Sequence, residues 1–525
     1  MGAGSLTAFV ACGEGALGDP AGGGGGYDDP STASAGGSTG AGVVIDAGVD
    51  APPPPEKEVE SSYGAPVATG NYVWIANPSS GRVAYIDAKS FEIKLVEAGN
   101  GPTFIAAVPD ATDDVAVVLN VLSHDATVLR TGSDGAITTA QIPVPPSGNA
   151  WAVSRDGRWA IAWTDSRQVT SADPVDGYQD VTVLDLKKGS EISTPLTVGY
   201  RPVAMAFDAA SQRAFAVTQD GVTVVSLLDP SGPAVVKNVA LGDTMGETTR
   251  DVSITPDGSY ALVRREGDAS VGVFSLADGT RTDVTLPGAP TDLDLFADGS
   301  AAVAVLRESG QVALLPVPGI AQDPTSFTLV PAGAPVGSAS LASKSPTALL
   351  YTNATPSSLL GVMGTTGTPS FRSILLRAPI LAVFPTPDAS NALVLHDALD
   401  TAGSHYAAAL SVVPVALDLP SKIVGLSAPV ISVAVAPAGD RALVATGSEA
   451  SGSYALTVAS MPSLAIQTIP LASLPIAAGI VEGAGRGFVA QKHPDGRITF
   501  VDLKTGEART LTGFELASQV VDGTR

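Results

Sequence analysis

The chain has 525 residues, of which 45% are hydrophobic and 15% are charged, and its formal net charge at pH 7 is −23. This acidic balance without a basic patch argues against a nucleic-acid partner, and no apolar run of about eighteen residues or more is present to span a membrane. A single cysteine allows no intramolecular disulfide, so the stability of the fold must come from packing.

The first feature along the chain is a short apolar segment that ends at the only cysteine. The sequence Leu6-Thr-Ala-Phe-Val-Ala precedes Cys12. It resembles a bacterial lipobox, which implies that residues 1–12 are the remnant of a signal peptide and that the Cys12 thiol carries lipid. Phe9 replaces the usual Leu and no Lys or Arg precedes the segment, so we expect the natural signal peptide to begin upstream of Met1. The alternative is a free cysteine in an unstructured tail.

Residues 13–63 are of low complexity and acidic. They include Gly22–Gly26 and Pro52–Pro55 and hold nine acidic residues against one Lys. Such a composition cannot bury a core and predicts disorder. About fifty flexible residues have a root-mean-square reach of roughly 40 Å, which suits a tether that holds a folded domain away from a membrane. The alternative is a disordered leader without a role.

From residue 64 to the end of the chain, a unit of roughly 45 residues recurs about ten times. One early copy reads Asn71-Tyr-Val-Trp-Ile-Ala-Asn-Pro, Gly81-Arg-Val-Ala-Tyr-Ile-Asp, Ile93-Lys-Leu-Val and Gly101-Pro-Thr-Phe-Ile-Ala-Ala-Val-Pro-Asp. Each copy holds four short apolar segments separated by turn residues, and Val, Ile and Ala suit strands buried between neighbouring sheets. The pattern predicts an all-β protein, a β-propeller built from four-stranded blades.

We call the four strands of a copy A to D, and strand B is the clearest of them. It is expected at Tyr72–Asn77, Asp114–Asn120, Arg158–Thr164, Arg213–Thr218, Ser259–Arg264, Ala301–Leu306, Ala348–Thr352, Asn391–His396, Arg441–Thr446 and Gly487–Gln491. Several A–B turns end in Asp-Gly, as in Ser154-Arg-Asp-Gly, Thr255-Pro-Asp-Gly and Phe296-Ala-Asp-Gly. Glycine accepts the positive φ of a tight turn, and Asp bonds its own backbone.

The absence of a linker-like break within residues 64–525 favours one domain, with about ten blades in a single ring. Propellers usually have four to eight blades, so two smaller propellers are the alternative. Val59–Gly70 is a weak strand, whereas the chain finishes with the surplus segment Phe514-Glu-Leu-Ala-Ser-Gln-Val-Val. We therefore expect this C-terminal segment to supply strand A of the first blade and to close the ring.

The repeat resembles the YVTN-type β-propeller repeat, in which a strand and Asn are followed by a polar turn, Val-x-Val-Ile-Asp, a strand and Gly-x-x-Pro. Residues 71–110 follow this pattern nearly throughout, and residues 158–299 follow it moderately. Residues 300–485 follow it loosely, with Ala-Pro in place of Gly-x-x-Pro, and residues 486–523 return to it. The resemblance implies an architecture and no particular activity, because loops carry the function of such folds.

No phosphate-binding loop, zinc-ligand spacing, nucleophile elbow or Cys-x-x-Cys-His sequence occurs, so we assign no catalytic residue, metal ligand or cofactor. The four histidines, His124, His396, His405 and His493, fall at B–C connections, where we expect solvated side chains. Only His396 and His405 are expected to lie close enough to act as a pair.

Two groups of aspartates resemble known kinds of site. Asp173, Asp176 and Asp180 cluster in the long B–C loop of the third copy but lack the spacing of a calcium-binding EF-hand loop. Asp292 and Asp294 alternate on a strand A, as paired catalytic carboxylates do. We expect both groups to be structural or solvated.

Aromatic and arginine residues are concentrated in the early D–A connections. Trp151, Tyr200, Arg201 and Arg250 lie there, whereas later connections read Ala-Pro or Leu-Pro. These residue types are enriched in binding hot spots, and the D–A loops are expected to surround the central channel. We therefore predict a ligand site at these four residues, the alternative being ordinary packing between the blades.

Together these features favour a non-enzymatic propeller that is anchored by lipid in the bacterial cell envelope, on the outer membrane or in the periplasm or extracellular space. Its partner is expected to be a protein, a polysaccharide or a small ligand, with the membrane reached only through the anchor. We expect a monomer. A propeller enzyme of the lactonase, lyase or oxidoreductase kind, or a purely structural envelope component, are the alternatives.

Overall fold

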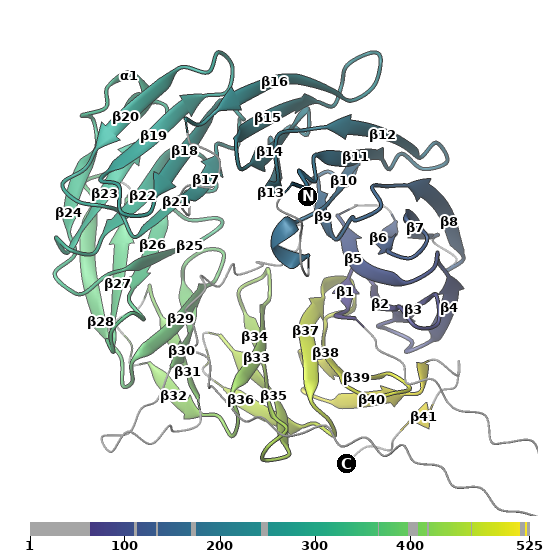
Figure 1. The fold of residues 1–525 in the computed structure, drawn as a ribbon. Coiled ribbons are helices and arrows are strands. Elements are labelled where there is room, and N and C mark those ends of the chain that lie inside the picture. The colour runs from purple at the N-terminus through teal and green to yellow at the C-terminus, as the bar shows by residue number, and fades with distance from the viewer. Residues whose placement is uncertain are drawn as a thin grey trace, which may run out of the picture. The chain divides into compact units, whose positions relative to one another are not determined.

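The computed structural model describes most of the repeat region and none of the first 63 residues, so Cys12 and the expected tether lie outside it. The described residues are 64–109, 113–132, 135–169, 175–242, 250–365, 367–396, 408–416, 419, 421–461, 463, 465–514 and 520–521. They form ten antiparallel sheets arranged in a ring, nine with four strands and one with five (Figure 1). The prediction of one ten-bladed β-propeller is confirmed, and the alternative of two smaller propellers is wrong.

Each blade is built from consecutive strands. Blades 1 to 5 comprise β1 (Val67–Ala68), β2 (Tyr72–Asn77), β3 (Arg82–Asp87), β4 (Ile93–Glu97); β5 (Pro102–Val108), β6 (Asp114–Asn120), β7 (Asp125–Thr131), β8 (Ile137–Pro143); β9 (Ala150–Val153), β10 (Trp159–Trp163), β11 (Asp180–Asp185), β12 (Ile192–Thr197); β13 (Pro202–Phe207), β14 (Arg213–Thr218), β15 (Gly221–Ser226), β16 (Ala234–Ala240); and β17 (Arg250–Ile254), β18 (Tyr260–Arg265), β19 (Ser270–Ser275), β20 (Arg281–Thr285).

Blades 6 to 10 comprise β21 (Asp292–Leu295), β22 (Ala301–Leu306), β23 (Gln311–Pro316), β24 (Thr328–Pro331); β25 (Ser338–Leu341), β26 (Thr347–Tyr351), β27 (Leu359–Gly364), β28 (Ser370–Leu375); β29 (Ile380–Pro385), β30 (Asn391–His396), β31 (Ala409–Pro414), β32 (Lys422–Gly425); β33 (Val430–Val435), β34 (Arg441–Ser448), β35 (Ser453–Ser460), β36 (Ile466–Pro470); and β37 (Pro475–Val481), β38 (Arg486–Gln491), β39 (Arg497–Asp502), β40 (Ala508–Thr512), β41 (Val520–Val521).

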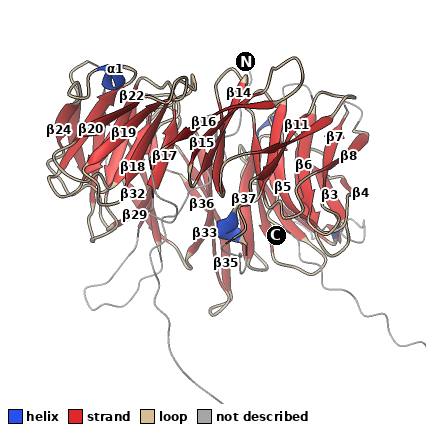
Figure 2. Cartoon of the chain, turned by 45° about the horizontal axis from the view of Figure 1, so that its top comes forward, coloured by secondary structure: helices blue, strands red, loops and turns tan. Residues whose placement is uncertain are grey.

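Helix is nearly absent from the described residues, as Figure 2 shows. It is limited to α1 (Gly319–Gln322) and the short 3₁₀ turns η1 (Ser166–Gln168) and η2 (Glu482–Ala484). None of these helices is long and apolar enough to cross a membrane. All ten expected B strands are present, each ending within two residues of its predicted bounds.

The ring closes through side chains of its first and last blades. One hydrophobic core lies between each pair of neighbouring blades, and a tenth joins blade 10 to blade 1. In this last core Phe91 of blade 1 meets Phe500 of blade 10 edge to face, with ring centroids 5.5 Å apart. The Gly483 amide also donates to the Gly70 carbonyl at 2.7 Å. The seam is therefore held by packing and a backbone hydrogen bond.

The expectation that the C-terminal segment supplies strand A of blade 1 is wrong. That place is taken by β1, in which Val67 and Ala68 pair with Trp74 and Val73 of β2. The C-terminal β41 instead pairs with β40 on the outer edge of blade 10. Phe514, which precedes it, is buried in the core between blades 10 and 1. The C-terminal segment thus contributes the Phe514 side chain to the contact between blades 10 and 1, and it adds no strand to blade 1.

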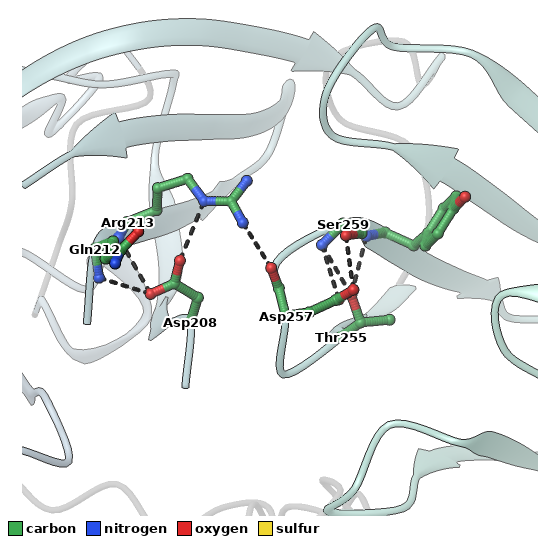
Figure 3. A network of polar contacts seen from close by, with 7 residues as sticks. Asp208, Gln212, Arg213, Thr255, Asp257 and Ser259 are labelled. Carbon is green, nitrogen blue, oxygen red and sulfur yellow. Dashed lines mark hydrogen bonds and ion pairs between the residues drawn. The ribbon is translucent and has the colours of Figure 1, made fainter. Parts of the chain in front are cut away.

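The A–B turns join neighbouring blades at one end of the ring. Arg213 of blade 4 donates through Nε to Asp208 Oδ2 at 3.1 Å and through Nη2 to the Asp257 carbonyl of blade 5 at 2.6 Å (Figure 3). The Asp-Gly turns are confirmed as tight turns. In one of them Gly157 has a φ of 69°, and a Cβ atom there would lie 1.7 Å from the Pro109 carbonyl oxygen of blade 2. Only glycine fits a turn packed this closely.

Candidate functional site

The opposite end of the ring carries the B–C and D–A connections, and we call it the loop face. It has a cavity of about 270 Å³ between blades 2 and 3. The cavity is lined by the D–A connection after β8, the end of β10 and the B–C loop before β11: Pro145, Pro146, Ser147, Thr164, Asp176, Gly177, Tyr178, Gln179 and Asp180. Most of these residues are exposed, so the cavity opens to solvent.

Several polar groups of this cavity have spare hydrogen-bonding capacity. The Ser147 and Thr164 hydroxyls bond to each other at 3.0 Å, and Gln179 donates through Nε2 to the Val198 carbonyl at 3.0 Å. The Asp176 carboxylate and the Tyr178 hydroxyl make no hydrogen bond or ion pair with any residue that the structure describes. A ligand with complementary groups would therefore find them available.

Tyr200 and Arg201, two of the predicted site residues, lie beside this cavity. The Arg201 amide donates to the Gly177 carbonyl at 2.7 Å, and Arg201 Nε donates to the Asp176 carbonyl at 3.0 Å. A Cβ atom on Gly177 would lie only 3.2 Å from Tyr200 Cδ2. Tyr178 and Arg201 both have a φ of 45°, a left-handed conformation that costs a non-glycine residue about 1–3 kcal/mol. These contacts fix the loop that forms one wall of the cavity.

Arg250 is connected to Tyr200 through blade 4. Its Nη2 donates to the Thr218 carbonyl, while Asp220 Oδ1 accepts from Thr218 Oγ1 at 2.6 Å and from the Tyr200 amide at 2.9 Å. Arg265 stands opposite Arg250 in the sheet. Burial, and next the charge of Arg265, lower the pKa of the Arg250 guanidinium, and Asp220 opposes this shift.

Trp151 lies apart from the other three predicted site residues. It is on β9, the inner strand of blade 3, and packs against the core between blades 2 and 3. Its Nε1 donates to the Phe104 carbonyl of blade 2 at 3.1 Å. The structure thus brings Tyr200, Arg201 and, through Asp220 and Thr218, Arg250 into one polar stretch, with Trp151 between the blades beside it.

Arg167 is a residue of this region that the sequence did not single out. Asp165 is buried and accepts from Arg167 Nε at 2.9 Å and from Arg167 Nη2 at 2.8 Å. Arg167 Nη2 also donates to the Val203 carbonyl of blade 4 at 2.7 Å. The sequence did contain one indication of this ion pair: Asp165 stands two residues before Arg167, at the start of the longest B–C loop. The cavity residues Ser147, Thr164 and Tyr178 carried no signal at all.

One histidine expectation is wrong. His396 is fully buried, with Nδ1 3.0 Å from the Pro379 carbonyl oxygen and Nε2 2.7 Å from Ser411 Oγ. Burial lowers its pKa. His124 is exposed as expected, His493 is half-buried, and His405 lies outside the described residues. No pair with His396 is therefore described.

The aspartates on strand A of blade 6 are half-buried rather than solvated. Burial, and then the neighbouring carboxylates of Asp292 and Asp251, raise the pKa of Asp294 to about 7. Asp292 accepts from the Ala339 amide of blade 7 at 2.7 Å, and burial raises its pKa as well. In the third copy, Asp173 lies outside the described residues. Among those that are described, no group of three or more His, Cys, Asp and Glu is placed to hold a metal ion.

No protein-family model matches this chain, and no curated protein matches it. Among solved structures, the dihydro-heme d1 dehydrogenase NirN in complex with DHE is 13% identical at a TM-score of 0.41, over 68% of this chain and 72% of that one. A eukaryotic initiation factor is 12% identical at a TM-score of 0.49, over 79% and 96%. Kluyveromyces lactis Hsv2 is 12% identical at a TM-score of 0.39, over 61% and 96%. These likenesses concern the fold and carry no argument on function.

Proposed function

We propose that this protein is a non-enzymatic binding propeller that captures its ligand on the loop face, beside Tyr200 and Arg201. The observation that carries the proposal is the cavity between blades 2 and 3, where Asp176 and Tyr178 present polar groups without a described partner. The Ser147 and Thr164 hydroxyls bond to each other at 3.0 Å rather than to a base that would activate either as a nucleophile. Such a lining suits binding better than acyl or phosphoryl transfer.

The test is a thermal-shift screen of the full chain with ligands of separate classes: neutral oligosaccharides, peptides, anionic metabolites and polyamines. A ligand present at one hundred times its Kd stabilises the folded state by about 2.7 kcal/mol. We expect at least one class to raise the melting temperature of the wild type and to have a weaker effect on Arg201→Ala, which removes the anchor of the cavity wall. A screen in which no class stabilises the protein would contradict the proposal.

The second part of the proposal concerns location. The apolar segment before Cys12 and the acidic stretch of residues 13–63 support a lipid anchor and a tether in a bacterial envelope. Expression in a bacterial host with labelled fatty acid tests this directly. The wild type should take up label and sediment with membranes, and Cys12→Ala should do neither. Label retained by Cys12→Ala would refute the anchor.

One observation favours a propeller enzyme as the second candidate. Asp294 has a pKa raised to about 7, which is where a general acid or base works best near neutral pH. Under this alternative, hydrolysis of a lactone or a lyase reaction would follow the ionisation of Asp294 and vanish in Asp294→Asn. An activity that survives this substitution would not belong to this group.

A further inference from the structure

The lining of the cavity is rich in hydrogen-bond acceptors. Asp176 offers a whole carboxylate, and Asp180 receives only one long bond, 3.3 Å from Thr197 Oγ1. Gln179 uses its NH₂ group on Val198, which leaves its amide oxygen as an acceptor. The hydroxyls of Ser147, Thr164 and Tyr178 add groups that can both donate and accept. A ligand that satisfies this set must donate several hydrogen bonds and accept a few.

The charges of the lining further limit the classes of ligand that the cavity can bind. The lining contains two carboxylates and no Lys or Arg, so it suits a neutral ligand better than an anionic one even though Arg201 lies beside the cavity. Among the described positions no three His, Cys, Asp or Glu side chains are grouped, so the cavity lacks the carboxylate cluster on which a typical Ca²⁺ site is built. A polyamine could donate but could not accept from the three hydroxyls. Neutral hydroxyl groups do both.

Two prolines and a tyrosine supply the apolar part of the lining. Pro145 and Pro146 border the cavity on the blade 2 side, and the half-buried Tyr178 borders it on the blade 3 side. A tyrosine ring can bury the C–H face of a cyclic ligand while the rim of that ligand makes hydrogen bonds. The volume of about 270 Å³ is just under the range of roughly 300–1,000 Å³ that is usual for drug-sized ligands, so one ring of a longer molecule fits. The opening to solvent leaves room for the rest.

We infer that this cavity binds one residue of a neutral saccharide chain, with Asp176 accepting from its hydroxyls and Tyr178 lying against its ring. The inference rests on the proposed function and names the ligand class of the same site. Gly177 lets the loop lie close to Tyr200. A Cβ atom at this position would approach Gln179 Oε1 to 2.9 Å and Tyr200 Cδ2 to 3.2 Å. A side chain at position 177 would require Gln179 and the Tyr200 ring to shift.

The experiment is calorimetric titration of the full chain with cellotetraose, maltotetraose and chitotetraose, beside tetragalacturonate and spermidine. We expect at least one neutral tetrasaccharide to bind with a Kd of about 1 mM or lower, and the two charged probes not to bind. Asp176→Asn and Tyr178→Asn should each weaken binding about tenfold or more, since the first replaces a charged acceptor by a neutral one and the second removes the ring. Asn at 178 tolerates the left-handed backbone, so the loop keeps its shape.

Glu266→Gln is the matched control, because Glu266 is an exposed acid in the B–C loop of blade 5, away from the cavity. Its affinity should equal that of the wild type, and circular dichroism should show an intact fold for all variants. Binding that is unchanged in Asp176→Asn and Tyr178→Asn, or no binding of any neutral probe, overturns the inference. If tetragalacturonate, spermidine or a peptide binds instead and depends on Arg201, the proposed function survives and only the saccharide assignment fails.

Discussion

Replacing Asp294 by Asn should stabilise the protein, and the gain should depend on pH. The pKa of Asp294 is raised from 3.8 to about 7 by burial and by the Asp292 and Asp251 carboxylates. The folded state therefore holds a proton that the unfolded chain releases. The contribution of such a carboxyl group to the stability of the protein is fully present below its pKa in the unfolded chain, 3.8. It is lost as the pH rises through its pKa in the folded protein, about 7.

The size of the effect follows from the shift. About three pKa units at about 1.4 kcal/mol each set an upper limit of about 4 kcal/mol for the destabilisation at pH 8. The side chain is only partly buried and water reaches it, so we expect about 1–3 kcal/mol. Asn carries no charge at any pH and has nearly the same shape. Its advantage should be near zero at pH 4, grow through pH 5 and 6, and level off above pH 7.

Urea unfolding followed by tryptophan fluorescence at pH 4, 6 and 8 measures the difference in the free energy of unfolding between wild type and variant. Asp298→Asn is the control with the opposite sign, because the Ser300 amide and hydroxyl lower the pKa of Asp298 and the substitution removes those bonds to a charge. Asp298→Asn should therefore lower the free energy of unfolding at pH 8. A constant difference for Asp294→Asn at all three pH values, or a loss of stability at pH 8, would refute the account of Asp294.

Three further predictions concern packing and burial. Gly157→Ala should lower the free energy of unfolding by about 3–5 kcal/mol, because its Cβ would lie 1.7 Å from a carbonyl oxygen. Gly189→Ala is the control: Gly189 has a similar φ and nothing within 4 Å, so the loss should be only about 1–2 kcal/mol. Thermal unfolding of the two variants measures the difference. The lowered pKa of the buried His396 means that stability is full above pH 6.5 and falls as the pH drops below it, a dependence that His396→Gln should flatten in the same assay. Truncation after Thr512 should cost about 3–5 kcal/mol more than truncation after Phe514, because only the first removes the buried ring; equal losses would count against its role at the seam.

The parts of the fold that the sequence predicted well are those with local causes. Strand B of every blade is a short apolar run between turn residues, and the Asp-Gly turns need only their own four residues. Strand A of blade 1 was not predicted, because β1 has only two residues, Val67 and Ala68. Their strand conformation depends on pairing with β2 and not on a local sequence pattern. The two valines of β41 looked equally fit for an inner strand, and nothing local distinguishes an inner edge from an outer one.

The site was less predictable for the same reason. Tyr200 and Arg201 were chosen by residue type, and their contact with Gly177 joins two different connections of the ring. The cavity wall of Ser147 and Thr164 comes from two blades, so no spacing in the sequence marks it. His396 was mistaken for a loop residue because it ends an apolar strand, and its burial depends on a carbonyl and a hydroxyl distant in sequence.

The way the ring closes bears on how such a protein can change in size. Every described blade takes its four main strands from one continuous stretch of chain, and no sheet is shared between the two ends. A gene segment that encodes one whole blade could therefore be duplicated or deleted without splitting a sheet. The new neighbours would need only to fit their facing side chains, as the first and last blades already do. Blade number is then an adjustable property of this architecture.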